Sequence, residues 1–150
     1  VPERAPDVAV SAHIAANQAH IYRLSGDYNP LHIAPEAAAF GGFAQPILHG
    51  LCTYGHCGQL LLGALCGGDA SRFAGLKLRF SSPVYPGDTL TLKQTITESR
   101  PMNSRPDVGL TRTLWEMFNQ HGDQVLLMDG YGMFRRREPA TPGEAPSAQG

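Results

Sequence analysis

The stretch Ile47-Leu-His-Gly-Leu-Cys-Thr-Tyr-Gly-His-Cys-Gly-Gln-Leu-Leu-Leu-Gly-Ala-Leu65 decides the fold. It contains no Asp, Glu, Lys or Arg, and its apolar residues cover nearly every side of a helix. A helix that is apolar all round is a buried one, and Gly50, Gly55 and Gly58 indicate close approach to a sheet or a ligand, since glycine is costly in a helix. We therefore predict a central helix over Ile47–Leu65.

A series of strands is expected after this helix. Residues 110–118 and 124–136 are two long β-compatible runs, and the segment Asn119-Gln-His-Gly-Asp123 between them offers glycine for a positive φ, so they should pair as a hairpin. Two shorter runs, separated by the turn Tyr85-Pro-Gly-Asp88, alternate apolar with mostly polar residues as half-buried strands do. Their apolar members are Leu76, Leu78 and Phe80 in the first and Leu90, Leu92 and Ile96 in the second.

Two shorter helices are expected before the central one. Val1–Val10 is polar and contains proline, so we expect an extended entry there. Apolar residues from Ile14 to Leu24 partly follow helical spacing, and Gly26 supplies a stop. Ala34–Phe40 is rich in alanine, with proline near its start, which predicts a second short helix that ends at Gly41-Gly42.

These elements predict an α+β fold in which an antiparallel sheet wraps around one long central helix. Residues 1–137 are expected to form a single domain, and residues 138–150, rich in Pro, Ala, Gly and Ser, a flexible tail. A sheet of this kind has an exposed edge, and pairing that edge with a second copy would protect it. We therefore expect a homodimer joined through sheet edges.

The composition narrows the class of partner and compartment. The 12 basic and 13 acidic side chains nearly balance, so no strong field favours nucleic acid or a membrane surface as a partner. No apolar run reaches the roughly 18 residues of a membrane span, and no secretory leader opens the chain. Three cysteines, an odd number, fit no closed disulfide framework. We expect a soluble protein of a reducing compartment that is not secreted.

The segment Tyr22-Arg-Leu-Ser-Gly-Asp-Tyr-Asn-Pro-Leu-His32 carries the candidate chemistry. It places Asp27 and His32 five residues apart across Pro30, among turn residues. The proline removes an amide donor and drives Asn29 away from the helical region, so the two side chains are not neighbours along one helix. The pattern predicts an acid/base pair in a rigid loop. From these residues alone, a plain turn in which Asp and Asn cap backbone amides is the alternative.

Two segments together resemble a known family. Tyr22–His32, followed by Ala38, and Gly42-Phe-Ala-Gln-Pro-Ile-Leu-His-Gly-Leu-Cys-Thr-Tyr-Gly55 are similar to the MaoC-like (R)-specific enoyl-CoA hydratases, or hydratase 2, and most of all to the hydratase domain of peroxisomal type 2 multifunctional enzymes. Ser71-Arg-Phe73 and Pro83-Val-Tyr-Pro-Gly87 extend the resemblance over most of the chain. It implies a hot-dog fold and reversible hydration of trans-2-enoyl-CoA to (R)-3-hydroxyacyl-CoA, in fatty-acid β-oxidation or related acyl-CoA metabolism.

The resemblance also implies the site and its surroundings. Asp27 and His32 would be the catalytic pair, the Gly50 backbone NH would bind the thioester oxygen, and Asn29 would help to position the loop at the substrate. Neither a metal nor a resident cofactor is implied, because coenzyme A enters as part of the substrate. The eukaryotic relatives join two hot-dog repeats in one chain, and only the catalytic type is present here, so a second copy would replace the other repeat. The compartment implied is the cytoplasm or the peroxisomal matrix.

The chemistry of hydration supports these assignments independently. Adding water to a conjugated double bond requires a base for the water, a proton for the α-carbon and donors for the charge on the thioester oxygen. Asp27 and His32 can share a water, and Gly50 lies in the first turn of a helix, where amides lack internal partners. An ionised aspartate and a neutral histidine are both available near neutral pH. Which of the two takes the first proton stays open.

Other residues admit a second function beside a structural one. His49, Cys52 and His56 share a helical face at spacings compatible with zinc, but no fourth ligand is evident, so no metal site is predicted and His49 is taken as a capping or packing residue. Basic residues can hold coenzyme A phosphates or simply face solvent, namely Lys77, Arg79, Arg100, Arg105 and Arg135–Arg137. Aromatic residues can line an acyl pocket or pack the core, namely Phe40, Phe43, Trp115 and Phe118.

Two other functions compete with hydration. A hot-dog acyl-CoA thioesterase commonly relies on a carboxylate on or beside the central helix, and Ile47–Leu65 has none. The second alternative is a non-catalytic acyl-CoA-binding half of a larger hot-dog protein. The presence of Asp27, His32 and Gly50 together favours an enzyme over such a binding module.

Overall fold

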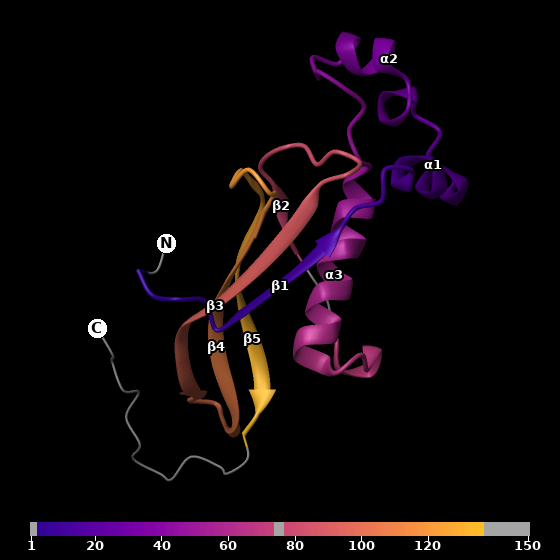
Figure 1. The fold of residues 1–150 in the computed structure, drawn as a ribbon. Helices are drawn as coiled ribbons and strands as arrows, with labels where there is room; N and C mark the ends of the chain where they lie inside the picture. Colours follow the sequence, from indigo (N-terminus) through magenta and orange to yellow (C-terminus); the bar gives the residue numbers. More distant parts are fainter. Residues whose placement is uncertain (1–2, 74–76, 137–150) are drawn as a thin grey trace.

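The computed structural model describes residues 3–73 and 77–136. Five strands form one antiparallel sheet in the order β1-β3-β4-β5-β2 (Figure 1). The strands are β1 (Val8–His13), β2 (Arg79–Phe80), β3 (Thr89–Met102), β4 (Arg105–Phe118) and β5 (Gln124–Arg135). The helices are α1 (Gln18–Tyr22), α2 (Pro35–Phe40) and α3 (Gly50–Cys66), and short 3-10 turns cover Arg23–Ser25, Pro30–His32 and Ala70–Arg72. The predicted α+β arrangement, an antiparallel sheet with one long helix, is confirmed.

The predicted turns between strands are confirmed in their chemistry. In the β4–β5 hairpin, the side-chain oxygen of Asn119 accepts hydrogen bonds from the amides of His121 and Asp123 at 3.0 and 2.9 Å. Gly122 has a φ of 87°, in the left-handed region that favours glycine. Before β3, the amide of Asp88 donates to the carbonyl of Tyr85 at 3.0 Å. Turn residues therefore set both connections, as the sequence indicates.

Several strand boundaries differ from the prediction. The expected extended entry over Val1–Val10 contains the start of a strand, since β1 pairs with β3 along its whole length. The run Leu76–Phe80 contributes only Arg79 and Phe80 to β2, and Leu76 lies outside the described residues. β4 begins at Arg105 instead of residue 110, because it continues to pair with the long strand β3 beyond the core. Pairing partners distant in the sequence, not local pattern, fix these ends.

The long helix α3 lies against the sheet but starts later than predicted (Figure 1). The amide of Leu48 donates to the carbonyl of Val84 at 2.7 Å, and His49 has an extended ψ of 135°, so Ile47 and Leu48 run alongside another loop before the helix begins at Gly50. This anchoring fixes the N-terminus of α3 beside residues 81–84.

The prediction that α3 is buried on all sides is wrong for this chain. One face is buried, through Cys52, Thr53, Cys57, Leu61 and Cys66. On the other face, Leu51 is 70% exposed and Leu65 is 40% exposed. The expected close approach at Gly55 and Gly58 is also absent, because an added Cβ at either would meet nothing within 4 Å. The sheet of one chain covers only one side of an apolar helix.

The helical segments before α3 gather at its N-terminal end, away from the sheet (Figure 1). The predicted helix over Ala34–Phe40 is confirmed as α2. The predicted helix over Ile14–Leu24 is shorter, because Ile14 is tied to the β3 entry: its amide donates to Asp88 and its carbonyl accepts from Gly87. Only α1 and the following 3-10 turn are helical there.

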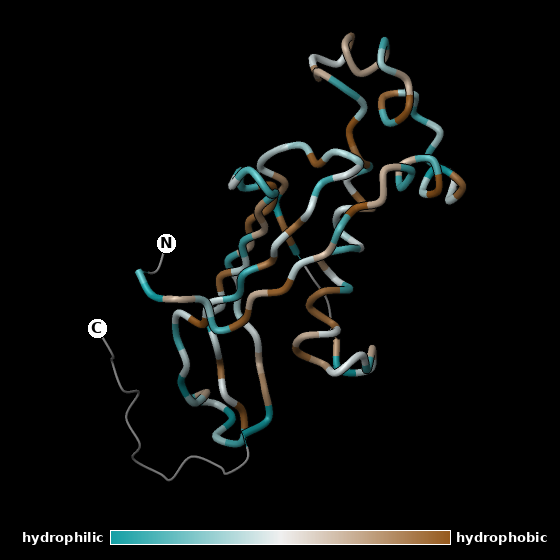
Figure 2. Tube along the Cα trace, in the orientation of Figure 1, coloured by the Kyte–Doolittle hydropathy of each residue, from teal (hydrophilic) through white to brown (hydrophobic). Residues whose placement is uncertain are grey.

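The core lies between the sheet and the buried face of α3. Hydrophobic and hydrophilic positions alternate along the strands (Figure 2), so one face of the sheet is apolar. The largest fully buried apolar side chains are Ile14, Leu90, Leu92, Met117, Val125 and Leu126, with Cys57 from the helix. Within the described residues, no helix combines the length and the hydropathy needed to cross a bilayer. The predicted end of the domain at residue 137 and the tail over 138–150 lie outside the described residues.

Candidate active site

The Asp27 loop begins at a glycine that the backbone requires. Gly26 follows the 3-10 turn Arg23–Ser25 and has a φ of 109°. An added Cβ at Gly26 would meet nothing within 4 Å, so the glycine is needed for its left-handed conformation and not for space. The loop then exposes Asp27 at its surface, where the carboxylate oxygen Oδ1 accepts the amide of Asn29 at 3.2 Å.

Asn29 and Pro30 form the short turn that carries His32. The side-chain oxygen of Asn29 accepts the amide of Leu31 at 3.0 Å and caps the 3-10 turn, and Pro30 occupies its first position. The carbonyl of Pro30 accepts the amides of Ile33 and Ala34 at 3.0 and 2.8 Å. Asn29 therefore holds the loop in shape, in agreement with its predicted positioning part, and contact with substrate stays a prediction.

The ring of His32 is fixed by a backbone carbonyl. His32 is 8% exposed, and its Nδ1 donates to the carbonyl of Ile47 at 2.8 Å. Because a carbonyl only accepts, Nδ1 carries the proton, and in the neutral ring Nε2 is left with its lone pair. His32 thus presents an acceptor nitrogen away from Ile47, which is the state a general base requires.

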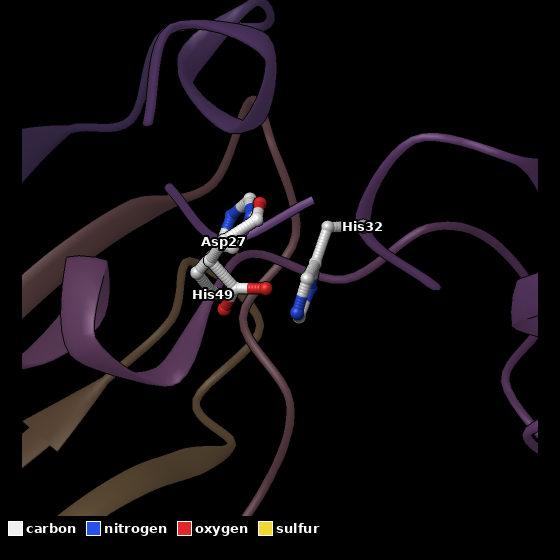
Figure 3. A group of neighbouring side chains, drawn as sticks. All are labelled: Asp27, His32 and His49. Atoms are coloured by element: carbon white, nitrogen blue, oxygen red, sulfur yellow. The ribbon is translucent and has the colours of Figure 1, made fainter. Parts of the chain in front are cut away.

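Asp27, His32 and a third residue, His49, converge at one point (Figure 3). One donor atom of each lies within 4.8 Å of the others. Figure 3 shows the Asp27 carboxylate turned toward the His32 ring. A water molecule at a normal hydrogen-bond distance of about 2.8 Å can contact both groups over such a gap. The structure therefore brings the predicted pair together, although the two residues come from different parts of the loop.

His49 was not among the predicted site residues. It is 1% exposed, its Nε2 donates to the backbone carbonyl of Asp27 at 3.3 Å, and its ring stacks on His32 with centroids 3.8 Å apart and planes at 27°. Burial lowers the pKa of His49, and the charge of a protonated His32 lowers it further. Its position directly before Gly50 was the available signal, because any residue preceding the helix start had to lie near the loop.

Gly50 opens α3 beside this cluster. Its amide has no hydrogen-bond acceptor among the described residues, whereas the amides of Cys52 and Thr53 both donate to the carbonyl of His49. A free first-turn amide at the positive end of a 17-residue helix is a favourable place for developing negative charge. An added Cβ at Gly50 would lie 3.5 Å from the ring of Phe80, which is ordinary van der Waals contact.

A cavity of about 360 Å³ joins these groups. His32 and Gly50 both line it, and Thr53, Ser81 and Ser82 add hydroxyl groups. Its apolar lining comes from Phe43, Ile47, Leu48, Phe80, Pro83 and Val84. The cavity is largely apolar with a few convergent polar groups at its wall, which is typical of a small-molecule site.

Of the four aromatic residues considered for an acyl pocket, Phe43 alone lines this cavity. Phe40 is 97% exposed on α2, and Phe118 lies under the ammonium of Lys93, 4.7 Å from its ring centre. Trp115 lines a separate groove of about 620 Å³ along β5, together with Lys77, Arg79 and Tyr131. Sequence pattern does not distinguish these aromatic residues, because their positions depend on how the sheet edge is left open.

The basic residues considered for coenzyme A divide into paired and unpaired groups. Arg100 pairs with Glu98 at 2.7 Å, and Arg105 lies 3.9 Å from Asp107. Lys77 and Arg79 are exposed and make no ion pair with any residue in 3–73 or 77–136. These two are the better placed to meet an external anion.

Asp27, His32 and His49 are also three donors of the kinds that bind metal ions. The geometry favours another use. The Nδ1 proton of His32 and the Nε2 proton of His49 are each directed at a backbone carbonyl, and the stacked rings turn their faces, not their lone pairs, toward each other. No group of three potential ligands in the described part of the chain includes Cys52 or His56, which formed the spacing considered for zinc.

Comparison with known proteins identifies the family. A MaoC-like domain matches residues 1–116, which include the Asp27 loop, α3 and most of β4. The chain belongs to the MaoC-like domain family. Its sheet and central helix are accordingly the expected hot-dog fold.

Relatives of this MaoC-like domain include named hydratases. The chain is 54% identical over 91 residues to enoyl-CoA hydratase ChsH3 of Mycobacterium tuberculosis, covering 61% of this chain and 32% of that protein. It is 52% identical over 90 residues to peroxisomal multifunctional enzyme type 2 of Mus musculus, covering 60% of this chain and 12% of that protein. The solved structure of an (R)-hydratase from A. caviae involved in PHA biosynthesis matches with a TM-score of 0.61 and 26% identity, covering 87% of this chain and 94% of that one. The chain thus spans about a third or less of these two curated relatives.

Proposed function

We propose that this MaoC-like domain catalyses the reversible hydration of a trans-2-enoyl-CoA to the (R)-3-hydroxyacyl-CoA, in fatty-acid β-oxidation or related acyl-CoA metabolism. The observation that carries the proposal is the meeting of a carboxylate, Asp27, and an imidazole, His32, within 4.8 Å at a cavity that also contains the start of α3. The names of the relatives, enoyl-CoA hydratases and an (R)-hydratase, support both the reaction and its stereochemistry.

Asp27 and His32 hold and activate the water in this proposal. The carboxylate of Asp27 accepts one of its hydrogen bonds and orients it, while Nε2 of His32 accepts the proton as the oxygen attacks the β-carbon. The Nδ1 bond to Ile47 supports this division, because it fixes the ring and leaves Nε2 free to accept. The proton then passes to the α-carbon. The products contain one added hydroxyl and one added hydrogen, so atoms and charge balance and no electron leaves the substrate.

Gly50 stabilises the intermediate charge. When the oxygen adds to the β-carbon, negative charge gathers on the thioester oxygen, and a positioned amide donor is worth about 3 to 4 kcal/mol to such a step. The Gly50 amide lacks an acceptor within the described residues, and it faces the same cavity as His32. Its glycine side also leaves room for the substrate next to Phe80.

We propose that the reaction needs no metal and no resident cofactor. The base, the proton and the donor for the oxygen are all supplied by Asp27, His32 and Gly50, and coenzyme A arrives with the substrate. A chelator should therefore leave the initial rate unchanged. A rate that falls on chelation and returns with a divalent cation would assign the three-residue cluster to a metal instead.

Self-association and location belong to the proposal as well. The exposed apolar residues of α3 and the edge of β5, which β2 covers over only two residues, are surfaces that a second copy would protect, so we propose a homodimer joined through sheet edges. The peroxisomal relative supports a peroxisomal matrix or cytoplasmic location without secretion, nucleic acid or a membrane partner. Sedimentation of the purified chain tests the dimer, and a mass of one chain at micromolar concentration argues against it.

One assay separates hydration from the two competing functions. Purified chain is incubated with crotonyl-CoA while conjugated absorbance and free thiol are both followed. Loss of absorbance without thiol means hydration, and release of thiol means thioester cleavage. The absence of Asp or Glu from α3 argues against cleavage. No change in either signal leaves a binding module, and a chain-length series then defines the acyl group that the 360 Å³ cavity accepts.

A further inference from the structure

His49 occupies the junction between the loop and the central helix without serving as a helix cap. It is the N-cap residue of α3, but its side chain makes no capping hydrogen bond. Its ring is 1% exposed and is turned toward the loop instead. The helix itself therefore gives no reason for a histidine at this position.

The ring contacts both members of the catalytic pair. Its Nε2 donates to the backbone carbonyl of Asp27 at 3.3 Å, and its face lies on the ring of His32 at 3.8 Å. On its other side lies the ring of Tyr22, with centroids 4.8 Å apart. The carbonyl of His49 accepts the amides of Cys52 and Thr53, which sets the first turn around Gly50. One residue thus contacts the loop, the imidazole and the helix start.

We propose that His49 is a positioning residue that fixes Asp27 and His32 relative to the Gly50 amide. This inference rests on the proposed hydratase function for its consequence, but not for its structural content. The hydrogen bond to Asp27 sets where the loop carries its carboxylate. The stacked ring limits rotation of His32 about its Ile47 hydrogen bond.

Packing alone does not account for the residue type. The Nδ1 of His49 is buried and has no partner within the described residues. Leaving such an atom unpaired costs about 1 to 3 kcal/mol, so a phenylalanine of similar shape would pack at lower cost. The polar edge that is used is Nε2, and it reaches only the carbonyl of Asp27. The imidazole is therefore explained by its contact with the loop.

Two substitutions separate the contacts. His49→Phe keeps a ring against His32 and Tyr22 and loses the bond to Asp27, whereas His49→Ala loses both. His56→Phe is the matched control, because it makes the same change two turns later on the same helix, away from the cavity. We expect kcat for crotonyl-CoA to fall about 10- to 100-fold in His49→Phe and further in His49→Ala, with KM within about twofold and the control near wild type.

A double-mutant cycle distinguishes positioning from general damage. If His49 acts through His32, then His49→Phe should change the residual rate of His32→Ala by less than about twofold, since the residue it positions is gone. The same fold-loss in both backgrounds would overturn the proposal, as would an unchanged kcat in His49→Phe.

Ring-nitrogen NMR tests the positioning without activity. In the wild-type chain His32 should show one tautomer with Nδ1 protonated, and in His49→Ala its signals should shift toward an average of the two tautomers. If crotonyl-CoA is not hydrated by the wild-type chain, the function fails while this measurement still decides the positioning. Identical His32 ring signals in both proteins would overturn it.

Discussion

The imidazole of His32 donates its Nδ1 proton to the backbone carbonyl of Ile47 at 2.8 Å. This bond joins the end of the catalytic loop to the residue that leads into α3. It leaves Nε2 as the nitrogen that can take a proton, and it places that nitrogen in the cavity shared with Gly50. The same bond thus determines both the direction of the ring and its chemical state.

Removing either acid/base group should abolish hydration while the fold survives. Asp27→Asn keeps an oxygen for the amide of Asn29 but cannot carry the charge, and His32→Ala removes the acceptor nitrogen. Each variant should lose at least about 100-fold in kcat for crotonyl-CoA. Asp69→Asn is the matched control, because Asp69 accepts the amide of Ser71 in the same way at 3.0 Å in another loop. Near-wild-type turnover in Asp27→Asn or His32→Ala would remove that residue from the mechanism.

Substituting Gly50 should impair catalysis without unfolding the chain. The Cβ of Gly50→Ala would lie 3.5 Å from the Phe80 ring, a normal contact, so circular dichroism and Tm should match the wild type. The methyl group would nevertheless occupy cavity space next to the amide proposed to bind the thioester oxygen. We expect kcat/KM to fall about 10-fold or more, consistent with partial loss of an oxyanion donor. Gly58→Ala, where an added Cβ meets nothing, should behave as wild type in both assays.

The burial of His49 should make the folded state sensitive to mild acid. Burial lowers its pKa below the ordinary value of 6.5, so below that pH the unfolded chain binds a proton that the folded chain does not. Lowering the pH therefore favours unfolding, and stability falls as the pH drops from 7 to 5. In urea titrations, His49→Phe should lose less stability over this range than the wild type. Parallel stability curves for the two proteins would show that His49 does not contribute.

The cysteine thiols should be unreactive in the native chain. Burial raises the pKa of the Cys57 thiol to about 11 and also raises that of Cys52, so little thiolate forms at pH 8. We expect a disulfide reagent such as DTNB to label Cys57 only after denaturation, when all three cysteines react. Rapid native labelling at Cys57 would contradict its placement in the core.

Sequence reasoning predicted the elements with strong local signals. The apolar run of α3, the Asn119–Asp123 turn and the glycine and proline positions of the Asp27 loop are fixed by local chemistry, and all were found. The missing strand β1 and the short β2 depend on pairing with β3 and β5, which a single sequence does not display. The open face of α3 likewise depends on what lies beyond one chain.

The candidate site was predictable to the same extent. Asp27, His32 and Gly50 follow from the chemistry that hydration requires and from their turn and helix-start positions. His49 was taken as a capping or packing residue, because its contacts with the loop arise only when residues 27 and 49 are brought together by the fold. Its ring stacking on His32 has no sequence periodicity that would reveal it.

The most direct test is a crystal structure of the chain with butyryl-CoA, a saturated substrate analogue that cannot be hydrated. The account predicts the thioester oxygen within about 3 Å of the Gly50 amide and one ordered water in contact with both Asp27 and Nε2 of His32, above the β-carbon. A thioester bound away from Gly50, or an Asp27 and a His32 that share no water, would contradict it.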